Sequence, residues 1–421
     1  MTVLHQQHRI SAVRRIGPCA YPTLHHRVSI ACKSSSPVDY ASSLPSSFRN
    51  AEYRRELEAA VDVVKRACRL CVDVKRSLFS GDGSRVVEKD DRTPVTVADF
   101  GVQALVSLEL GKQFPSIPLV AEEDSASIRA TSLADFVTNA VTDKAAPVDR
   151  PPTKDDVLKA IDRGGKDAAS FGIQPATYWI LDPIDGTRGF LKENESLYVV
   201  GLALVVGGEI VLGVMGCPNW QPSFSDVVEN ELQEGQDRGL KLGLIMISHT
   251  GCGTWTRWLS DMLDPTRALS GLWTRTLVDG FSSAHEGRFC IPESQAWESL
   301  PLSATFKATT PDTPRKDEIV LLKACCGSLC KYMLIASGRA SVYIQRVKPK
   351  ATVKAWDHAV GIICVLEAGG KVTDWEGTEL NLAADTSERR TICPNGGVLV
   401  TNRNIHDEIL MMISTSSSTR I

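Results

Sequence analysis

Two aspartates three residues apart, Asp182 and Asp185, lie in a Trp-Ile-Leu-Asp-Pro-Ile-Asp-Gly-Thr segment whose residue types could perform chemistry. Carboxylates this close together repel one another unless a positive charge lies between them. Mg²⁺ suits such a place, because it prefers oxygen ligands and accepts water and phosphate as the others. Gly186 lets the backbone approach a ligand closely, and Thr187 offers a hydroxyl and a main-chain N–H. Taken alone, the segment is also typical of an Asp-Pro turn with an Asx cap, so its interpretation depends on the rest of the sequence.

Three further carboxylates stand where a strand ends or a helix begins. Glu122 follows the apolar run 117–121, Asp99 falls in the first turn of a helix that begins after an N-cap threonine, and Asp357 opens another helix. Each has an ordinary explanation: a solvated loop, a capping carboxylate and a partner of the helix dipole, respectively. Asp99 could also lie next to a metal-bound water. Together with the two aspartates of the Asp-Pro segment, and without a His/Cys set, the group indicates hard cations, more than one of them.

Hydrophobic periodicity predicts the elements that would position these residues. Helical spacing predicts an amphipathic helix over 51–78, and Tyr178 to Leu181 is predicted to be a buried strand that Asp182-Pro183 terminates. Gly207-Gly208 is predicted to join two strands in a hairpin. The other predicted strands cover 117–121, 242–247, 272–277, 319–322, 341–344, 371–373 and 398–400, and the other predicted helices cover 96–113, 133–140, 154–161, 331–336, 355–368 and a final segment from 406. The segment 125–177 is interpreted as a helical excursion without identifiable chemistry.

Length and charge bound the possibilities. A protein of 421 residues, 43% hydrophobic, can bury a large core and usually forms two domains. With 47 basic and 50 acidic residues the net charge is −3, which gives no electrostatic reason to expect a nucleic-acid partner. No apolar run approaches the roughly 20 residues that span a bilayer, so no membrane partner is expected either.

The N-terminus has a composition of its own. Residues 1–38 contain five Lys or Arg residues and no Asp or Glu, and serines follow to residue 47. This is typical of an organellar transit peptide, which we expect to occupy residues 1–48 and to be removed between about residue 30 and residue 50. A disordered basic tail is the alternative. The early arginines favour the mitochondrion, whereas the long serine-rich continuation also suits a chloroplast.

Twelve cysteines do not form a recognisable disulfide or zinc pattern. Cys68 and Cys71 share one predicted helix, where their spacing fits an apolar pair. Cys325, Cys326 and Cys330 form the densest cluster, without a partner motif at zinc spacing, and redox sensing there is a minor alternative. Reduced thiols are the expectation for an organelle matrix.

Several motifs resemble those of the lithium-sensitive, magnesium-dependent phosphatases of the inositol monophosphatase superfamily. The segment 181–187 resembles the superfamily's D-P-[IL]-D-G-T, and 121–123 resembles its G-E-E. The segment 356–370, with Trp-Asp-His-Ala and Ala-Gly-Gly at its ends, is similar to W-D-x-A…E-A-G-G. The segments 94–99 and 185–191 are similar to the P-V-T-x-x-D and D-G-T-[KR]-G-F-L of the 3′(2′),5′-bisphosphate nucleotidase branch. The resemblance covers roughly residues 51 to 415.

The resemblance implies a fold and a mechanism. The fold would be a layered αβαβα sandwich of the inositol monophosphatase/fructose-1,6-bisphosphatase type. An N-terminal α+β part (49–255) and a C-terminal α/β part (256–421) would meet at the active site. Two or three Mg²⁺ ions would be held by Glu122, Asp182, Asp185, Asp357 and the Ile184 carbonyl. Asp99 and Thr187 would position and deprotonate the attacking water. Phosphate and the rest of the substrate would be bound by Gly186, Thr187, His285, Ser328, Lys331 and Asp357.

The resemblance also implies a substrate, but fewer residues of this sequence support the substrate than support the metal site. The expected reaction removes the 3′-phosphate of 3′-phosphoadenosine 5′-phosphate (PAP) and gives AMP and phosphate. The sulfate-bearing relative of PAP is a second candidate substrate. The protein is expected to be a monomer. The family's S-Q-A-K segment is matched at Ser328 and Lys331, but Gln345 stands where the family has arginine, with Arg346 adjacent. An inositol polyphosphate 1-phosphatase is therefore the alternative. A non-catalytic nucleotide sensor is disfavoured, since a pure binder has no use for Asp99 and Thr187 as a water activator.

Overall fold

The computed structural model describes most of the protein after residue 43, and residues 44–421 form one compact unit. The described residues are 44–80, 86–88, 94–145, 150–172, 174, 176–192, 196–221, 243–263, 272–303, 306, 320–322 and 326–418. The expected transit peptide lies almost wholly outside this set, so it stays a prediction. The expected division after residue 255 falls within one strand of the unit and also stays a prediction.

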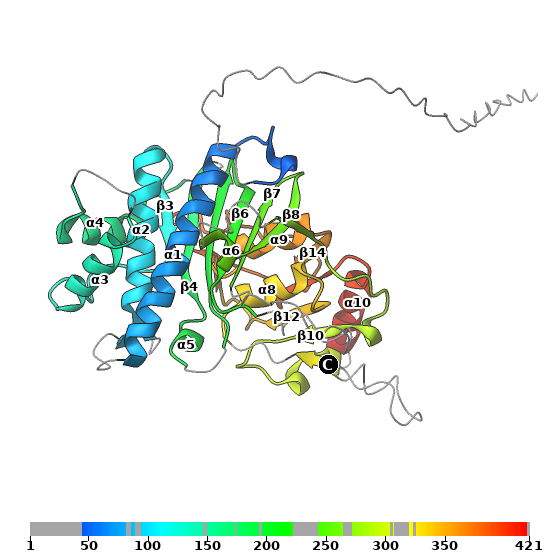
Figure 1. Ribbon diagram of the computed structural model, residues 1–421. Helices are drawn as coiled ribbons and strands as arrows, with labels where there is room; N and C mark the ends of the chain where they lie inside the picture. The colour runs from blue at the N-terminus through cyan, green and yellow to red at the C-terminus, as the bar shows by residue number, and fades with distance from the viewer. Residues whose placement is uncertain are drawn as a thin grey trace, which may run out of the picture. The chain divides into compact units, whose positions relative to one another are not determined.

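A seven-stranded sheet forms the first half of the described structure, in the order β3-β4-β5-β6-β7-β8-β9 (Figure 1). β3 and β4 are parallel, and every later neighbour is antiparallel. The strands are β3 (Leu119–Ala121), β4 (Tyr178–Asp185), β5 (Val199–Val206), β6 (Glu209–Cys217), β7 (Leu244–His249), β8 (Gly253–Trp258) and β9 (Thr274–Thr276). The Gly207-Gly208 hairpin is confirmed, with positive φ at both glycines.

A second sheet of five strands has the order β11-β10-β12-β16-β14 and mixes parallel with antiparallel pairs. Its strands are β10 (Arg288–Cys290), β11 (Val320–Leu322), β12 (Val342–Arg346), β14 (Gly370–Asp374) and β16 (Gly397–Asn402). Two short ribbons pair β1 (Val86–Glu88) with β2 (Pro94–Thr96) and β13 (Val353–Lys354) with β15 (Thr391–Ile392).

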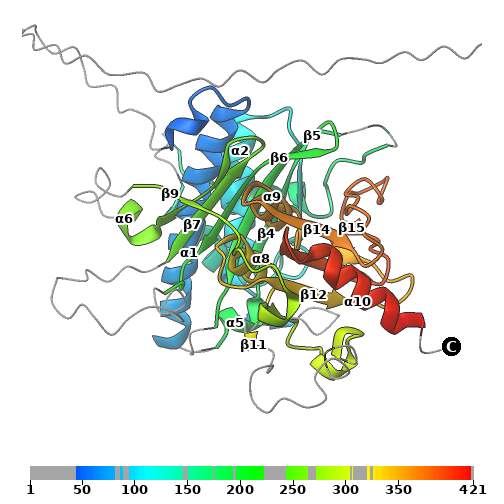
Figure 2. The same ribbon diagram turned by 90° about the vertical axis from the view of Figure 1, so that its right-hand side faces the viewer.

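Helices separate and cover the two sheets. The helices are α1 (Arg54–Ser80), α2 (Val97–Gln113), α3 (Leu133–Thr142), α4 (Lys154–Gly164), α5 (Thr187–Phe190), α6 (Leu259–Leu263), α8 (Leu329–Ala336), α9 (Ala359–Glu367) and α10 (His406–Ser418). Helices α1 and α2 contact the seven-stranded sheet, whereas α8 and α9 contact strands of both sheets and α10 contacts β16 (Figures 1 and 2). The expected αβαβα layering is therefore confirmed.

The alternation of side chains along the strands explains the layers. In β5, Leu202 and Leu204 join the apolar cluster beneath α1 and α2, while Ala203 and Val205 join the cluster that surrounds α8 and α9. Successive side chains of a strand point to opposite faces, so a strand that is apolar throughout buries both. A third cluster lies between the second sheet and α10. The seven-stranded sheet is thus covered on both faces.

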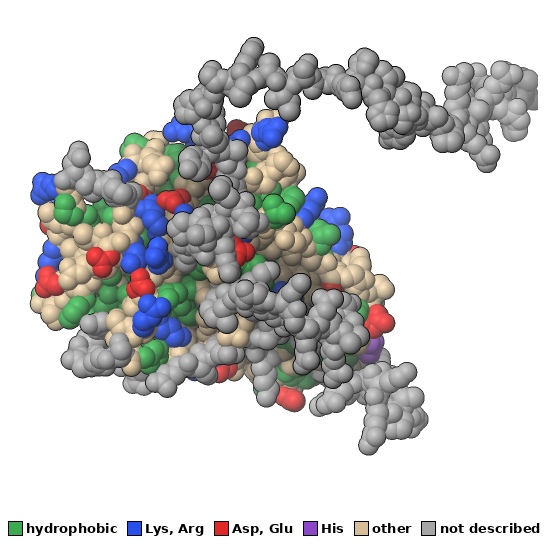
Figure 3. Space-filling view, viewed as in Figure 1, with side chains coloured by type: hydrophobic (Ala, Val, Ile, Leu, Met, Phe, Trp, Pro, Cys, Tyr) green, Lys and Arg blue, Asp and Glu red, His purple; other side chains and the backbone are tan. Residues whose placement is uncertain are grey.

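Local sequence determines where α2 begins and which side of α1 is buried. Helix α1 buries an apolar face, on which Leu78 is only partly buried, and Asp62 pairs with Lys65 and Arg66 one turn later. Thr96 caps α2 in a capping box with Asp99. Figure 3 shows basic and acidic side chains interspersed on the face that carries these helices. Among the described residues, no helix is both long and apolar enough to cross a bilayer.

The predicted end of β4 is wrong. The strand does not stop at Asp182-Pro183 but continues to Asp185, and its register against β5 shifts between Asp182 and Asp185. Proline lacks the N–H that a regular ladder requires, and an irregularity accommodates it without ending the strand. As a result both aspartates are carried by one buried strand.

Candidate active site

The first carboxylates come from two neighbouring parallel strands, with Glu122 directly after β3 and Asp182 three residues before the end of β4. Ala121, the last residue of β3, pairs with Leu181 of β4, so Glu122 and Asp182 follow at the same edge of the sheet. Asp357 stands two residues before α9, in the layer beneath. One oxygen each from Asp182, Asp185 and Asp357 lies within 4.8 Å of the other two. The predicted gathering of these three carboxylates is therefore present in the structure.

Their electrostatics favour a bound cation. Burial, followed by the charges of Asp185 and Glu122, raises the pKa of Asp182 well above its ordinary value. Burial and the charge of Asp185 do the same to the pKa of Asp357. Oδ1 of Asp182 is buried and has no hydrogen-bond partner among the described residues. An unpartnered buried carboxylate oxygen is costly, and a hard cation would satisfy it and offset the repulsion. The all-oxygen donor set therefore fits Mg²⁺.

Asp185 is held by the backbone where α8 begins. Its Oδ1 accepts from the Ser328 N–H at 2.9 Å, and its Oδ2 accepts from the Leu329 N–H at 2.6 Å. Burial raises the pKa of Asp185 to about 6, and these N–H groups and Lys331 oppose the rise. A carboxylate oxygen accepts more than one interaction, so both oxygens remain able to approach a cation.

Asp99 combines the two roles considered for it. Its Oδ2 accepts from the Thr96 N–H at 2.8 Å and from the Thr96 hydroxyl at 2.7 Å, as a capping carboxylate does. Its Oδ1 lies 3.2 Å from the hydroxyl of Thr187, which also lies 3.1 Å from the Ile184 carbonyl oxygen. The helix cap thus fixes Asp99 in an orientation that reaches Thr187 with its other oxygen.

A cavity of about 520 Å³ is bordered by the carboxylates and Thr187, whereas Asp99 is not among its described lining residues and contacts it through Thr187. Predicted site residues that line it are Glu122, Asp182, Ile184, Asp185, Gly186, Thr187, Ser328, Lys331 and Asp357. Lining residues that the sequence did not indicate are Arg188, Pro292, Glu293, Ser294, Cys326, Gly327 and Tyr343. Arg188 had a weak signal, since it follows Thr187 directly, and Tyr343 lies two residues before Gln345 on the same face of β12.

His285 does not belong to the described lining of this cavity. It lies in the short helix Ala284–Glu286, is exposed, and packs edge-on against Phe306 with ring centroids 4.8 Å apart. Its role in substrate binding stays a prediction. Arg346 is also not among the described lining residues of the cavity, and its guanidinium donates to the Ser299 carbonyl at 3.3 Å.

Another part of the cavity lining is a neutral hydrogen-bond network beside the buried ammonium group of Lys331. The Tyr343 hydroxyl lies 2.8 Å from Oε1 of Gln345 and 3.3 Å from the hydroxyl of Ser328. Lys331 is 2% exposed and donates to the Gly327 carbonyl at 2.5 Å. An ammonium group has three donors, so Lys331 retains capacity for an anionic ligand.

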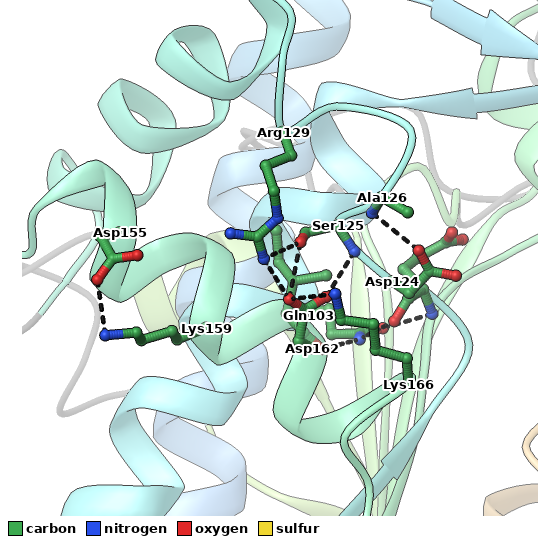
Figure 4. Close-up of polar contacts among 11 residues, drawn as sticks. Gln103, Asp124, Ser125, Ala126, Arg129, Asp155, Lys159, Asp162 and Lys166 are labelled. Carbon is green, nitrogen blue, oxygen red and sulfur yellow. Dashed lines mark hydrogen bonds and ion pairs between the residues drawn. The ribbon is translucent and has the colours of Figure 1, made fainter.

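The loop that carries Glu122 is held both by α2 and by the segment 125–177, for which the sequence indicated no chemistry. Gln103 of α2 receives the Glu123 N–H at 2.8 Å and donates to the Glu123 carbonyl at 2.6 Å. Asp162 of α4 accepts from the Ser125 N–H and hydroxyl, both at 2.8 Å, and Figure 4 shows Arg129 reaching the same carboxylate. The excursion therefore anchors a predicted ligand loop.

The cysteines depart in part from the expectation of reduced thiols. Cys68 and Cys71 are buried free thiols, and burial raises the pKa of the Cys330 thiol to about 11. Cys326, which lines the cavity, is disulfide-bonded. Cys325 lies outside the described residues.

Proteins of similar sequence can be aligned with this protein over most of its length. The model of the inositol monophosphatase family matches residues 52–239 and 293–418. The Arabidopsis thaliana protein named "Putative 3'(2'),5'-bisphosphate nucleotidase, mitochondrial" is 59% identical over 377 residues, which cover 89% of this protein and 91% of that one. The "3',5'-bisphosphate nucleotidase 2" of the same plant is 32% identical over 373 residues, 86% of this protein and 97% of that one. Among solved structures, the extragenic suppressor protein suhB of Bartonella henselae has a TM-score of 0.50 at 17% identity, covering 85% of this protein and 98% of that one, and thus shares the fold.

Proposed function

The protein belongs to the inositol monophosphatase family, and on this basis we propose that it is a Mg²⁺-dependent phosphatase that hydrolyses the 3′-phosphate of PAP to give AMP and phosphate. The names of the two Arabidopsis relatives support the nucleotide substrate. The observation that carries the proposal is the buried acidic group with its unpartnered Asp182 oxygen among the described residues, next to the Asp99–Thr187 pair.

Two or three Mg²⁺ ions would be held by the carboxylates and carbonyl predicted for them, namely Glu122, Asp182, Asp185, Asp357 and Ile184. When bound, Mg²⁺ supplies charge neutralisation and Lewis acidity at the phosphate. The rest of the mechanism belongs to the protein's own residues, and most of it is positioning and electrostatic stabilisation.

Thr187 and Asp99 would handle the proton of the attacking water. The Thr187 hydroxyl has one proton, and donating it to Asp99 leaves its oxygen lone pairs facing the cavity, where they can accept from water. The N–H groups of Gly186 and Thr187 would donate to phosphate oxygens. Lys331 and Ser328 would bind the rest of the substrate.

An Asp99→Asn variant tests this assignment. An amide can still accept from Thr96 through its oxygen, so we expect a folded protein that binds nucleotide but loses turnover by several orders of magnitude. Phosphate release and equilibrium binding of PAP are measured on the same preparation. Wild-type turnover in this variant contradicts the mechanism, and activity that survives full chelation contradicts the metal.

A second candidate, an inositol polyphosphate 1-phosphatase, is favoured by one observation. Gln345 is neutral and engaged with Tyr343, while Arg346 faces Ser299, so the arginine that the nucleotidases use is not replaced from the adjacent position. Phosphate release from PAP, its sulfate-bearing relative and inositol 1,4-bisphosphate, each with and without Li⁺, discriminates the two. Preference for the inositol compound would overturn the nucleotide proposal, and Li⁺ is expected to inhibit in either case.

The site of action is proposed to be the mitochondrion. The acid-poor, arginine-bearing N-terminus and the name of the more similar of the two Arabidopsis relatives support it. A fluorescent fusion of the full-length protein, imaged against mitochondrial and chloroplast markers, tests this. The protein is proposed to act as a monomer, which light scattering of the purified protein tests.

A further inference from the structure

Two consecutive arginines, Arg389 and Arg390, lie just before β15, and both bind backbone carbonyl groups. Nη1 and Nη2 of Arg390 donate to the Ala121 carbonyl at 2.8 and 2.9 Å, and Nη2 also donates to the Gly165 carbonyl at 3.2 Å. Ala121 is the last residue of β3 and directly precedes Glu122. The C-terminal part of the protein therefore holds the peptide that leads into a predicted metal ligand.

The same arginine also holds the segment that leads into Asp357. Its guanidinium lies over the ring of Trp356, 5.2 Å from the centroid, and its backbone carbonyl accepts from the Ala355 N–H at 2.8 Å. A planar guanidinium can stack on an aromatic face while its edge donates hydrogen bonds, which an ammonium cannot do in the same way. Arg390 thus contacts the residue before Glu122 and the residues before Asp357 at once.

On the other side, the Glu122 segment is fixed by Gln103, which binds both backbone groups of Glu123. Glu122 is therefore flanked by two anchored peptides, one held from α2 and one held by Arg390. Movement of Arg390 would change the position of Glu122 relative to Asp357, because one anchor would be lost while the other stayed.

We infer that Arg390 is a positioning residue that sets the separation of the Glu122 and Asp357 carboxylates and thereby the affinity of the site for Mg²⁺. The inference rests on the proposed metal site but not on the identity of the substrate. Groups that orient metal ligands from behind typically contribute about 10–100-fold to metal affinity. Arg390 acts through the backbone and the indole ring and touches no reacting atom.

Arg389 supplies a matched control. It is 1% exposed, donates to the carbonyls of Ala383 and Asp385 and to those of Gly172 and Gln174, and lies 5.9 Å from the Phe171 ring centroid. It therefore resembles Arg390, whose side chain is 17% exposed, in being a guanidinium bound to carbonyls beside a ring. None of the partners named for it adjoins a predicted ligand.

The test compares Arg390→Lys with Arg389→Lys in the full-length protein. Mg²⁺ binding is measured by calorimetry without substrate, and the Mg²⁺ concentration for half-maximal phosphate release is measured separately. We expect Arg390→Lys to weaken Mg²⁺ binding about 10–100-fold, with turnover recovering at high Mg²⁺. Lysine keeps the positive charge but lacks the planar guanidinium group, whose N–H donors bind two carbonyls while it stacks on Trp356. Arg389→Lys is expected to lower Tm with Mg²⁺ affinity unchanged within about twofold.

A milder variant, Trp356→Phe, keeps an aromatic face and covers the case in which Arg390→Lys does not fold. It is expected to weaken Mg²⁺ binding in the same direction by a smaller factor. Wild-type Mg²⁺ affinity in both site variants, or an equal loss in Arg389→Lys, overturns the inference. A wild-type protein that binds Mg²⁺ without hydrolysing PAP refutes the proposed substrate alone, and one that binds no Mg²⁺ refutes the inference as well.

Discussion

Replacing Gly327 with alanine tests how closely the backbone must approach Asp185. Gly327 has φ +62, and a Cβ at this position would lie 2.2 Å from Oδ2 and 2.7 Å from Oδ1 of Asp185. Real Cβ contacts essentially never fall below 3.0 Å, so the two groups must separate by about 0.8 Å (3.0 minus 2.2). The carboxylate, the turn before α8, or both must therefore move.

A displacement of this size should be visible in catalysis. A misplacement of about 1 Å can cost about 10²-fold in rate, so we expect kcat/KM to fall about 100-fold, equivalent to roughly 2.7 kcal/mol of transition-state stabilisation. Mg²⁺ affinity should fall with it, since Asp185 is a proposed ligand. Positive φ adds a penalty for alanine of about 1 kcal/mol in the folded state.

Gly207 separates the backbone penalty from the displacement. It has φ +58 in the β5–β6 hairpin, and a Cβ there meets nothing within 4 Å. Gly207→Ala should therefore share the conformational penalty, a Tm loss of no more than about 2–4 °C, and keep wild-type kcat/KM. Phosphate release over a range of Mg²⁺ concentrations and a thermal melt are recorded for both variants. Wild-type activity in Gly327→Ala, or an equal loss in Gly207→Ala, would refute the reasoning.

Three further changes test the site and the fold. Asp182→Asn removes one of the mutually repelling carboxylates, so the Tm of the variant in chelator should exceed that of the wild type. Mg²⁺ should no longer raise the Tm of the variant. Thermal melts with and without Mg²⁺ test both expectations. Gly165→Ala would place a Cβ 2.0 Å from the Glu123 carbonyl oxygen and should weaken Mg²⁺ binding about 10–100-fold, whereas Gly172→Ala, in open space, should not. Burial lowers the pKa of His406 to about 4 from 6.5, so the unfolded protein binds a proton that the folded protein does not between these values. The unfolding free energy should therefore fall as the pH drops from 6.5 to 4, and urea titrations should find this fall reduced in His406→Gln.

Elements with strong local signals were predictable from the sequence. The capping box at Thr96 and the Gly207-Gly208 turn act within a few residues, so their outcome depends little on distant contacts. By contrast, β10 has three residues and pairs only with β11 and β12 among the described strands, both of which lie later in the sequence by about 30 residues or more. The equally short β3 and β11 were predicted because they lie in apolar runs, whereas β10 begins with Arg288 and lies in no such run, so no local pattern indicated this strand.

The same distinction applies to the site. Carboxylates at strand ends and helix starts are visible in sequence, because the ends of neighbouring elements meet in layered folds. The groups that hold them are not. Gln103 lies 20 positions from Glu123, Asp162 lies 37 positions from Ser125, and Arg390 lies 269 positions from Ala121. Glutamine, aspartate and arginine at these positions have no local signature, since their partners are backbone groups that every residue carries.

Asp99, Asp185 and Asp182 differ in how many of their carboxylate oxygens are hydrogen-bonded by the protein, and this difference indicates how the site is built. Asp99 gives one oxygen to a helix cap, and Asp185 gives both oxygens to the backbone that opens α8, so each is needed locally whether or not a cation is bound. Asp182 leaves a buried oxygen without a partner among the described residues. Asp182 therefore carries a free-energy cost that a cation can remove, as does Asp357, whose pKa is raised in the same way. A site arranged in this way keeps its geometry without metal and gains the most from metal at one atom, which favours tight binding with little rearrangement.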